Sequence, residues 1–121
     1  METQEYNGWS NRETWATALH IDNDQALYEL AQEYIQHAFK DCESPLMCLE
    51  ESLENWITED LLTFENIAGN HGLWLMLTDI GSLYRVNWRE IAENYLEEAN
   101  YRTRTLVRSL QEAEELEEAD A

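Results

Sequence analysis

Carboxylates are the reactive side chains that this sequence supplies in quantity. From Asp41 to Tyr84 the chain carries nine acidic residues and no lysine or arginine. Most of them fall in one predicted helix: Glu50, Glu51, Glu54, Glu59, Asp60 and Glu65. Glu51 and Glu54 are three residues apart and Glu50 and Glu54 four, which places these carboxylates about 5 to 6 Å apart on one helix face. Because like charges at this spacing destabilise a helix, the absence of interspersed lysines indicates a functional use.

Residue types that catalyse reactions or bind metals are poorly grouped. His20, His37 and His71 are far apart in sequence and belong to no HExxH or Cys/His ligand pattern. Asp22 and Glu33 match the ends of a calcium loop, but its interior lacks the required glycine and falls in a predicted helix. The sequence has no nucleophile elbow or phosphate loop. We therefore predict no catalytic residue, metal site or cofactor, and a hydrolase with paired carboxylates is the least favoured function class.

The two cysteines and the N-terminal residues indicate the cellular compartment in which we expect the protein. Cys42 and Cys48 are six residues apart, with no second pair and no zinc-type histidine spacing. The polar start METQEYNG lacks the basic and apolar regions of a signal peptide, and no apolar run reaches the length of a membrane span. We expect two free thiols and a location in the host-cell cytosol, away from membranes.

The net charge limits the partners. Lysine and arginine number 7 against 26 acidic residues, which gives a formal charge of −19 and a pI near 4.2. Nucleic acids and anionic membranes would repel such a chain, so the expected partners are basic. Nineteen charges correspond to roughly 32 Å of duplex DNA, and a compact chain of this length is roughly 35 Å across. Mimicry of DNA, another role with a basic partner, and solubility alone all remain open.

Composition predicts an all-α fold. The chain has 121 residues, which suits one domain, and contains only four glycines and one proline. No long alternation of β-branched residues is present. We predict a compact bundle of about five helices in a single acidic domain over residues 1–110. Residues 111–121 are predicted to be an acidic tail or a frayed helix end.

Local signals mark the predicted helices. Asp24 begins a helix that runs to about residue 40, and Ser44-Pro45 begins one that continues to about Ile67, with Phe64 directed inward. Residues 73–84 are apolar nearly all round, which predicts a central buried helix, with a short buried strand as the alternative. An Asn-x-x-Glu box at Asn87 begins the last helix. Trp56, Trp74 and Trp88 occupy core-like positions in these helices.

The stretch from Asn7 to Asp24 is unusually rich in local signals. Ser10 and Glu13 fit a capping box at the start of the first helix, and Trp15 fits its buried face. Trp9 precedes the cap and fits a hydrophobic staple. Asn11 has no role in this interpretation, and neither has Arg12. The signature residues Trp9, Ser10, Asn11, Glu13 and Trp15 are therefore predicted to be mainly structural.

The segment Asn7-Gly8-Trp9-Ser10-Asn11-Arg12-Glu13-Thr14-Trp15 resembles the N-terminal signature of a family of small, largely uncharacterised phage and plasmid proteins. The resemblance implies a mobile-element origin and no catalytic residues. In length, acidity and helical character the chain also resembles the DNA-mimicking antirestriction proteins of phages.

We expect a non-enzymatic inhibitor of a host defence protein, either a Cas subunit or a restriction enzyme. The six clustered carboxylates would occupy its basic nucleic-acid-binding groove. The alternative is a helical interaction module that binds a basic protein without mimicking DNA. A homodimer would extend the acidic surface, and residues 73–84 are the apolar segment that could form its interface.

Overall fold

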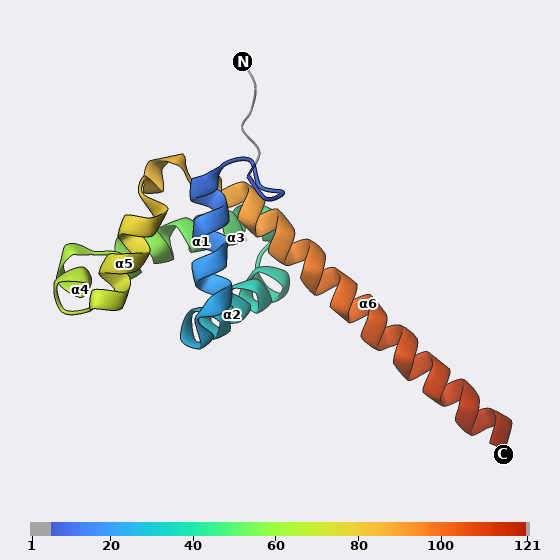
Figure 1. The fold of residues 1–121 in the computed structure, drawn as a ribbon. Helices are drawn as coiled ribbons and strands as arrows, with labels where there is room; N and C mark the ends of the chain where they lie inside the picture. The colour runs from blue at the N-terminus through green and yellow to red at the C-terminus, as the bar shows by residue number, and fades with distance from the viewer. Residues whose placement is uncertain (1–5, 121) are drawn as a thin grey trace.

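The computed structural model describes the backbone of residues 6–120 and the side chains of residues 6–117. Within that part of the chain all regular elements are helices, so the all-α prediction is confirmed (Figure 1). The alternative of a buried strand is wrong, because residues 6–120 contain only an isolated bridge between Tyr6 and Trp9. The elements are α1 (Arg12–Asn23), α2 (Gln25–Asp41), α3 (Pro45–Asn55), the π-helix η1 (Trp56–Leu61), α4 (Phe64–Ala68), α5 (His71–Ile80), the 3-10 turn η2 (Leu83–Arg85) and α6 (Trp88–Asp120).

Short polar side chains begin most helices. Asp24 accepts a hydrogen bond from the backbone N–H of Leu27 at the start of α2. Asn70 does the same for Leu73 in α5, where it follows the break at Gly69. The N-cap of α3 is Ser44, with a proline at the first helical position. The starts of α2 and α3 follow the sequence prediction because such signals lie within one turn, although the Ser44 side chain forms no cap hydrogen bond. The start of α5 does not follow it, because that element was expected to begin at residue 73.

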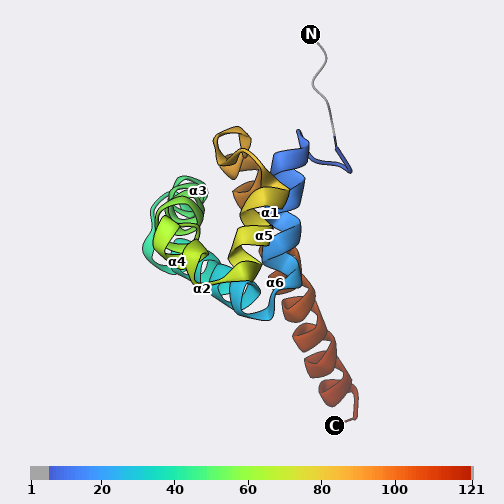
Figure 2. The same ribbon diagram turned by 60° about the vertical axis from the view of Figure 1, so that its left-hand side comes forward.

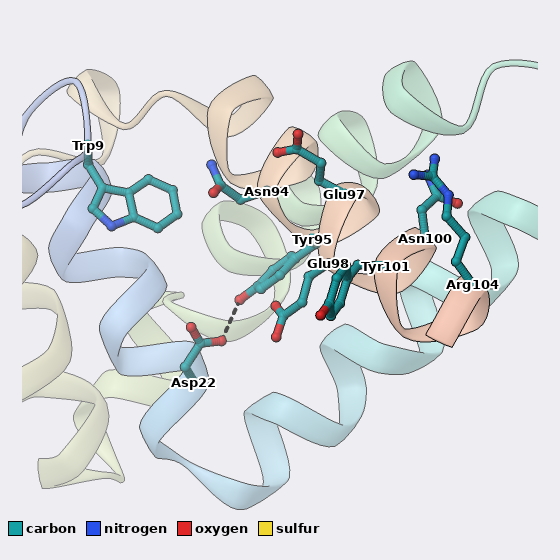
Figure 3. Close-up of a pocket in the computed structure, with 9 residues that line it drawn as sticks. All are labelled: Trp9, Asp22, Asn94, Tyr95, Glu97, Glu98, Asn100, Tyr101 and Arg104. Atoms are coloured by element: carbon teal, nitrogen blue, oxygen red, sulfur yellow. Dashed lines mark hydrogen bonds between the residues drawn. The ribbon is translucent and has the colours of Figure 1, made fainter. Parts of the chain in front are cut away.

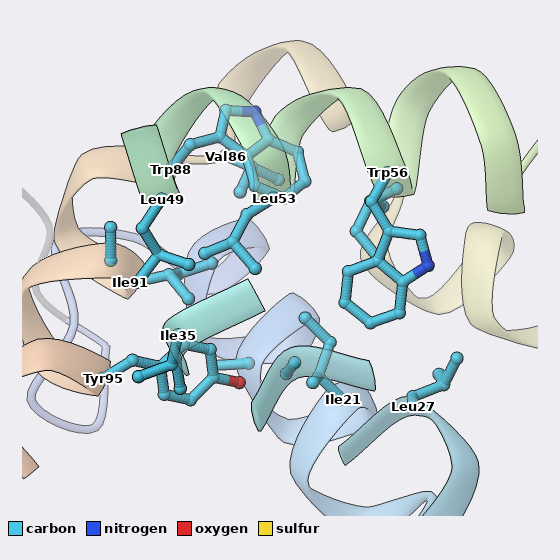
Figure 4. Packing of buried hydrophobic residues seen from close by; sticks show 14 of the residues in the cluster. Ile21, Leu27, Ile35, Leu49, Leu53, Trp56, Val86, Trp88, Ile91 and Tyr95 are labelled. Carbon is cyan, nitrogen blue, oxygen red and sulfur yellow. The ribbon is translucent and has the colours of Figure 1, made fainter. Parts of the chain in front are cut away.

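The core is built around α3, which packs between α2 and α6, while α1 covers α2, α5 and the start of α6. Figure 4 shows the apolar side chains of these helices converging on one another. Every helical element except α4 and η2 contributes buried side chains; they include Ile21, Leu27, Ile35, Leu49, Leu53, Trp56, Ile57, Ile80, Trp88, Ile91 and Tyr95. The predicted burial of Trp56 and Trp88 is confirmed.

The predicted helix from Ser44 to Ile67 is not continuous. It widens into η1, where the N–H of Leu62 donates to the carbonyl of Ile57 at 3.0 Å, and then stops before α4. After this break α4 turns its first residue outward, and Phe64 is 87% exposed instead of buried. No local residue signal marks the change, because both parts of the segment have helical composition.

The apolar run at 73–84 is not a central buried helix. It forms α5 and η2, and α5 contacts α1 on one side and α4 on another. Met76 and Ile80 are buried, but Trp74 is 49% exposed and Leu75 is similar. The prediction for Trp74 is therefore wrong, because its helix lies at the rim of the bundle, where the contacts with α1 and α4 leave this side chain half exposed.

Helix α6 is much longer than the body it packs on. Figures 1 and 2 show its C-terminal half projecting away from the other helices in both views. The backbone is helical as far as Asp120, and residues 100–117 are all exposed. Among the described helices, none combines the length and hydropathy needed to cross a bilayer.

Candidate functional site

The predicted acidic residues lie on the consecutive elements α3, η1 and α4. We call Glu50, Glu51, Glu54, Glu59, Asp60 and Glu65 the acidic edge. Glu50 is half-buried and the other five are exposed. None of the six forms an ion pair with a described residue; the ion pairs of the described residues involve other carboxylates. The acidic edge therefore presents its charge to solvent without an internal counter-charge.

The π-helix η1 fixes the middle of the acidic edge. Its first two residues, Trp56 and Ile57, are buried and anchor the turn to the core. The amide of Asn66 donates to the carbonyl oxygens of Asp60 at 2.7 Å and Leu61 at 3.2 Å, which ties the end of η1 to α4. Single π-turns inside α-helices are rare and occur frequently at functional sites. Here the turn holds Glu59 and Asp60 on the solvent side of a rigid anchor.

The charge spacing of the acidic edge is close to that of a DNA strand. Residues 50–60 cover about 15 Å at a helical rise of about 1.5 Å per residue. The five carboxylates in this range amount to about one charge per 3 Å, whereas one strand of duplex DNA carries one per about 3.4 Å. In linear charge density the acidic edge resembles one strand.

The negative potential of the acidic edge extends to α2. The ring of Tyr34 packs against that of Trp56 in a tilted arrangement, with ring centroids 5.4 Å apart. Burial is the largest cause that raises the pKa of Tyr34, and the charges of Asp60 and Glu33 raise it further. Ionisation of this phenol is therefore suppressed, and Tyr34 is available as a neutral hydrogen-bonding group beside the acidic edge.

The signature residues form a junction between chain segments that are distant in sequence. The N-cap of α1 is Asn11, not Ser10: its side-chain oxygen accepts from the backbone N–H of Thr14 at 2.8 Å. Ser10 instead donates from its backbone N–H and its hydroxyl to the carboxylate of Glu90, at 3.0 and 2.8 Å. The capping-box prediction is wrong because a carboxylate eighty residues away outcompetes the local one.

The remaining bonds of this junction join α1 to the start of α6. The fully buried Thr14 donates its hydroxyl to the Asn11 side chain and accepts from the backbone N–H of Asn87 at 2.8 Å. Asn11 also donates to the carbonyl of Arg85 at 2.8 Å. We call Ser10, Asn11, Thr14, Asn87 and Glu90 the signature junction. The hydrogen bonds of this junction give Asn11 a structural role, which the sequence alone did not indicate.

Arg12 has a partner as well. Its guanidinium contacts the carbonyl and the carboxylate of Asp79, the latter at 3.0 Å, and His20 lies 2.7 Å from the same carboxylate. The hydrogen bond from His20 is the largest cause that lowers the pKa of Asp79, and Arg12 lowers it further. Glu13 pairs with Arg85 at 3.7 Å. These contacts attach α1 to the end of α5 and to η2.

A shallow hollow of about 640 Å³ lies where α6 passes Trp9 and the end of α1. In Figure 3 the hydroxyl of Tyr95 points to Asp22, to which it donates at 3.0 Å. Burial is the largest cause that raises the pKa of Asp22, and burial also raises the pKa of Tyr95. The Asp22 side chain, although its residue is exposed, is thus engaged in linking α1 to α6, and among the described residues no nucleophile and base are paired beside it.

Among the described residues, one group could hold a metal ion. The ligand atoms of His37, Cys42 and Cys48 lie within 4.8 Å of one another, and Asp41 contacts the His37 ring at 3.0 Å. Cys42 and Cys48 are joined in a disulfide, so the expectation of two free thiols is wrong. The turn between α2 and α3 brings them together, which their spacing alone did not indicate. In this state the sulfurs offer no thiolate to a metal.

The sequence matches the model of a protein family. The model of a family of unknown function, DUF7249, matches residues 2–116. The chain belongs to this family. The DUF7249 match includes the signature junction, the acidic edge and most of α6, so all three lie in one family domain. No curated protein and no solved structure matches the chain.

Proposed function

We propose that this member of the DUF7249 family is a non-enzymatic inhibitor of a host defence protein, carried by a phage or plasmid. The acidic edge occupies the basic nucleic-acid-binding groove of a Cas subunit or restriction enzyme in place of DNA. The observation that supports this proposal is a group of carboxylates on consecutive elements, five of the six exposed, without counter-charges among the described residues. Over residues 50–60 their average linear charge density is close to that of one DNA strand.

The physics of association favours such a mechanism. A basic groove attracts a chain of charge −19 over long distances, so association is fast and depends steeply on ionic strength. Arginines and lysines that normally hold phosphates would pair with Glu50, Glu51 and Glu54 at one end of the acidic edge and with Glu59 and Asp60 at the other. Because the carboxylates stand on anchored helices, little backbone conformational entropy is lost on binding.

The resemblance of residues 7–15 to phage and plasmid proteins supports the biological side of the proposal. Mobile elements enter cells that attack foreign nucleic acid, and an inhibitor that imitates DNA needs no recognition of a particular sequence. The signature itself takes no part in binding in this proposal, since its polar groups are engaged in the signature junction.

The alternative is an interaction module that captures a basic protein through its helical surface without entering a nucleic-acid groove. Both functions require a basic partner and both weaken in salt. They differ in their response to DNA, because a partner held outside its nucleic-acid groove remains bound when duplex is added.

The test is affinity capture from a bacterial lysate at low salt, with elution first by duplex DNA and then by high salt. We expect a nucleic-acid-binding nuclease or Cas subunit in the DNA eluate. The triple variant E50K/E51K/E54K should lose this protein. Proteins that elute only with salt would favour the alternative function.

A matched control variant shows whether loss of capture depends on the position of the substituted carboxylates or only on the change in net charge. The variant E29K/E97K/E115K makes the same change in charge at three exposed sites scattered over α2 and α6. It should retain the captured protein, and both variants should keep their helical circular dichroism. Equal loss of capture in the two variants would contradict the assignment of the acidic edge.

A further inference from the structure

The free half of α6 carries an apolar stripe that nothing in the described chain covers. Leu106 is 61% exposed and Leu110 is 57% exposed, and Val107 and Leu116 beside them are also exposed. We call residues 101–120 the α6 extension. A single helix of this length is marginal in water unless an apolar face is packed against a partner. Its leucines therefore indicate a missing neighbour.

The stripe continues the face by which α6 packs on the body. Leu96 and Ala99 pack against the core at the point where α6 leaves α3. The intervals from Leu96 through Ala99, Thr103, Leu106 and Leu110 to Ala113 alternate between three and four residues. This is the spacing of a coiled-coil seam. The first residues of the seam, Leu96 and Ala99, pack against the core. The seam residues of the α6 extension have no partner in the described chain.

The charges of the α6 extension change sign along its length. Arg102, Arg104 and Arg108 lie in its first half, and the acidic residues of its second half begin at Glu112. A parallel pair of such helices would place like charges at the same level. An antiparallel pair centred near residue 108 places Arg104 level with Glu112 of the second copy and Arg102 level with Glu114. The same register brings Leu106 against Leu110 of the second copy.

We infer that the α6 extension pairs with that of a second copy of this chain, as an antiparallel two-helix coil. This geometry also reduces the repulsion between two chains of charge −19. The two points where α6 leaves its body, near residue 100, are then about 24 Å apart at about 1.5 Å per residue. That distance is roughly three Debye lengths at 0.15 M ionic strength, where the Debye length is about 8 Å. The inference is independent of the proposed function.

Sedimentation velocity and small-angle X-ray scattering of the whole chain, at about 0.15 M salt and up to about 100 µM protein, test the pairing. We expect a dimer whose scattering shows two separated bodies. L106E/L110E should be monomeric, and F64E/Y84E, which changes two exposed aromatic residues outside the stripe, should remain dimeric. A monomeric wild type, a dimer that survives L106E/L110E, or a single compact body would overturn the inference.

A charge variant tests the orientation and guards against a folding defect in the leucine variant. E112R/E114R leaves the stripe intact and makes the chain less acidic by four charges. If only net charge mattered, its dimer would be tighter than that of the wild type. Antiparallel pairing predicts the opposite, a dimer at least tenfold weaker, because the new arginines lie level with Arg104 and Arg102 of the second copy and replace an attraction by a repulsion. An unchanged or tighter dimer would overturn the antiparallel arrangement.

Discussion

Two acidic regions of the molecule use their carboxylates in different ways. Around α1, Glu90 accepts from Ser10, Asp79 is held by Arg12 and His20, and Glu13 faces Arg85. In the acidic edge, by contrast, no carboxylate has an ionic partner among the described residues. The carboxylates around α1 fasten helices together. Those of the acidic edge form no ion pair with the described residues, which leaves their charge free for a partner.

The largest expected difference between the two regions is in stability. Glu90→Ala leaves the backbone N–H and hydroxyl of Ser10 without their charged acceptor, and it should lower the free energy of unfolding by about 2 kcal/mol. Glu54→Ala, at an exposed site of α3, should change it by less than about 0.5 kcal/mol. Urea unfolding followed by circular dichroism measures both. Equal losses would show that the two kinds of carboxylate do not differ as described.

A smaller effect is expected from the cap within the signature junction. Asn11→Ala removes the acceptor for Thr14 and the donor to Arg85, and it should cost about 1 to 2 kcal/mol. Asn11→Ser keeps a capping oxygen and should recover about half of the loss. The midpoints of thermal unfolding rank the two variants against the wild type. If Ser10→Ala proved costly and Asn11→Ala harmless, the cap would be Ser10 after all.

The two aspartates that join α1 to its neighbours should respond oppositely to pH. The pKa of Asp79 is lowered by His20 and Arg12, so its stabilising effect is present above its unfolded pKa of 3.8 and is lost as pH falls through its folded value. The pKa of Asp22 is raised, chiefly by burial, so the ionised form costs stability at neutral pH and the cost disappears as pH falls through its folded value.

Two substitutions measure this contrast. Asp79→Asn should destabilise the protein at pH 7 and Asp22→Asn, which keeps an acceptor for Tyr95, should be neutral or slightly stabilising. The Asp22→Asn difference should shrink as pH falls towards 3.8, the ordinary carboxyl pKa, whereas the Asp79→Asn difference should shrink mainly below that value. Urea unfolding of dilute protein at several pH values gives the comparison. A loss for Asp22→Asn as large as for Asp79→Asn would contradict the opposite signs.

The smallest expected effect concerns the acidic edge itself. E50Q/E51Q/E54Q removes like-charge pairs three and four residues apart, and it should stabilise α3 by a few tenths of a kcal/mol per pair. The same variant should lose most of the partner binding. Stabilisation without loss of binding would assign these carboxylates to solubility alone.

Much of the helical framework was predictable because its signals are local. Asp24 begins α2 through a contact within one turn, and Ser44-Pro45 begins α3 with a proline at the first helical position, so the sequence nearby is sufficient. Trp56 and Trp88 were placed in the core by periodicity alone. The acidic residues were predicted on one continuous helix, and the structure places them on three consecutive elements instead.

The remaining features depend on residues that are distant in sequence or on tertiary position. Ser10 lost its capping role to Glu90, and the exposure of Phe64 and Trp74 depends on where α4 and α5 lie relative to the core. The wide turn of η1 has no composition of its own, and the Cys42–Cys48 disulfide arises from the bend between two helices. Each of these features depends on how the helices pack in three dimensions, which local sequence patterns do not describe.

The most direct test of the mimicry proposal is displacement of labelled duplex DNA from the captured target, followed by fluorescence anisotropy. We predict that the wild type and E29K/E97K/E115K displace the duplex completely and that E50K/E51K/E54K needs at least tenfold higher concentration. A target that binds the duplex and this protein at the same time would contradict DNA mimicry by the acidic edge.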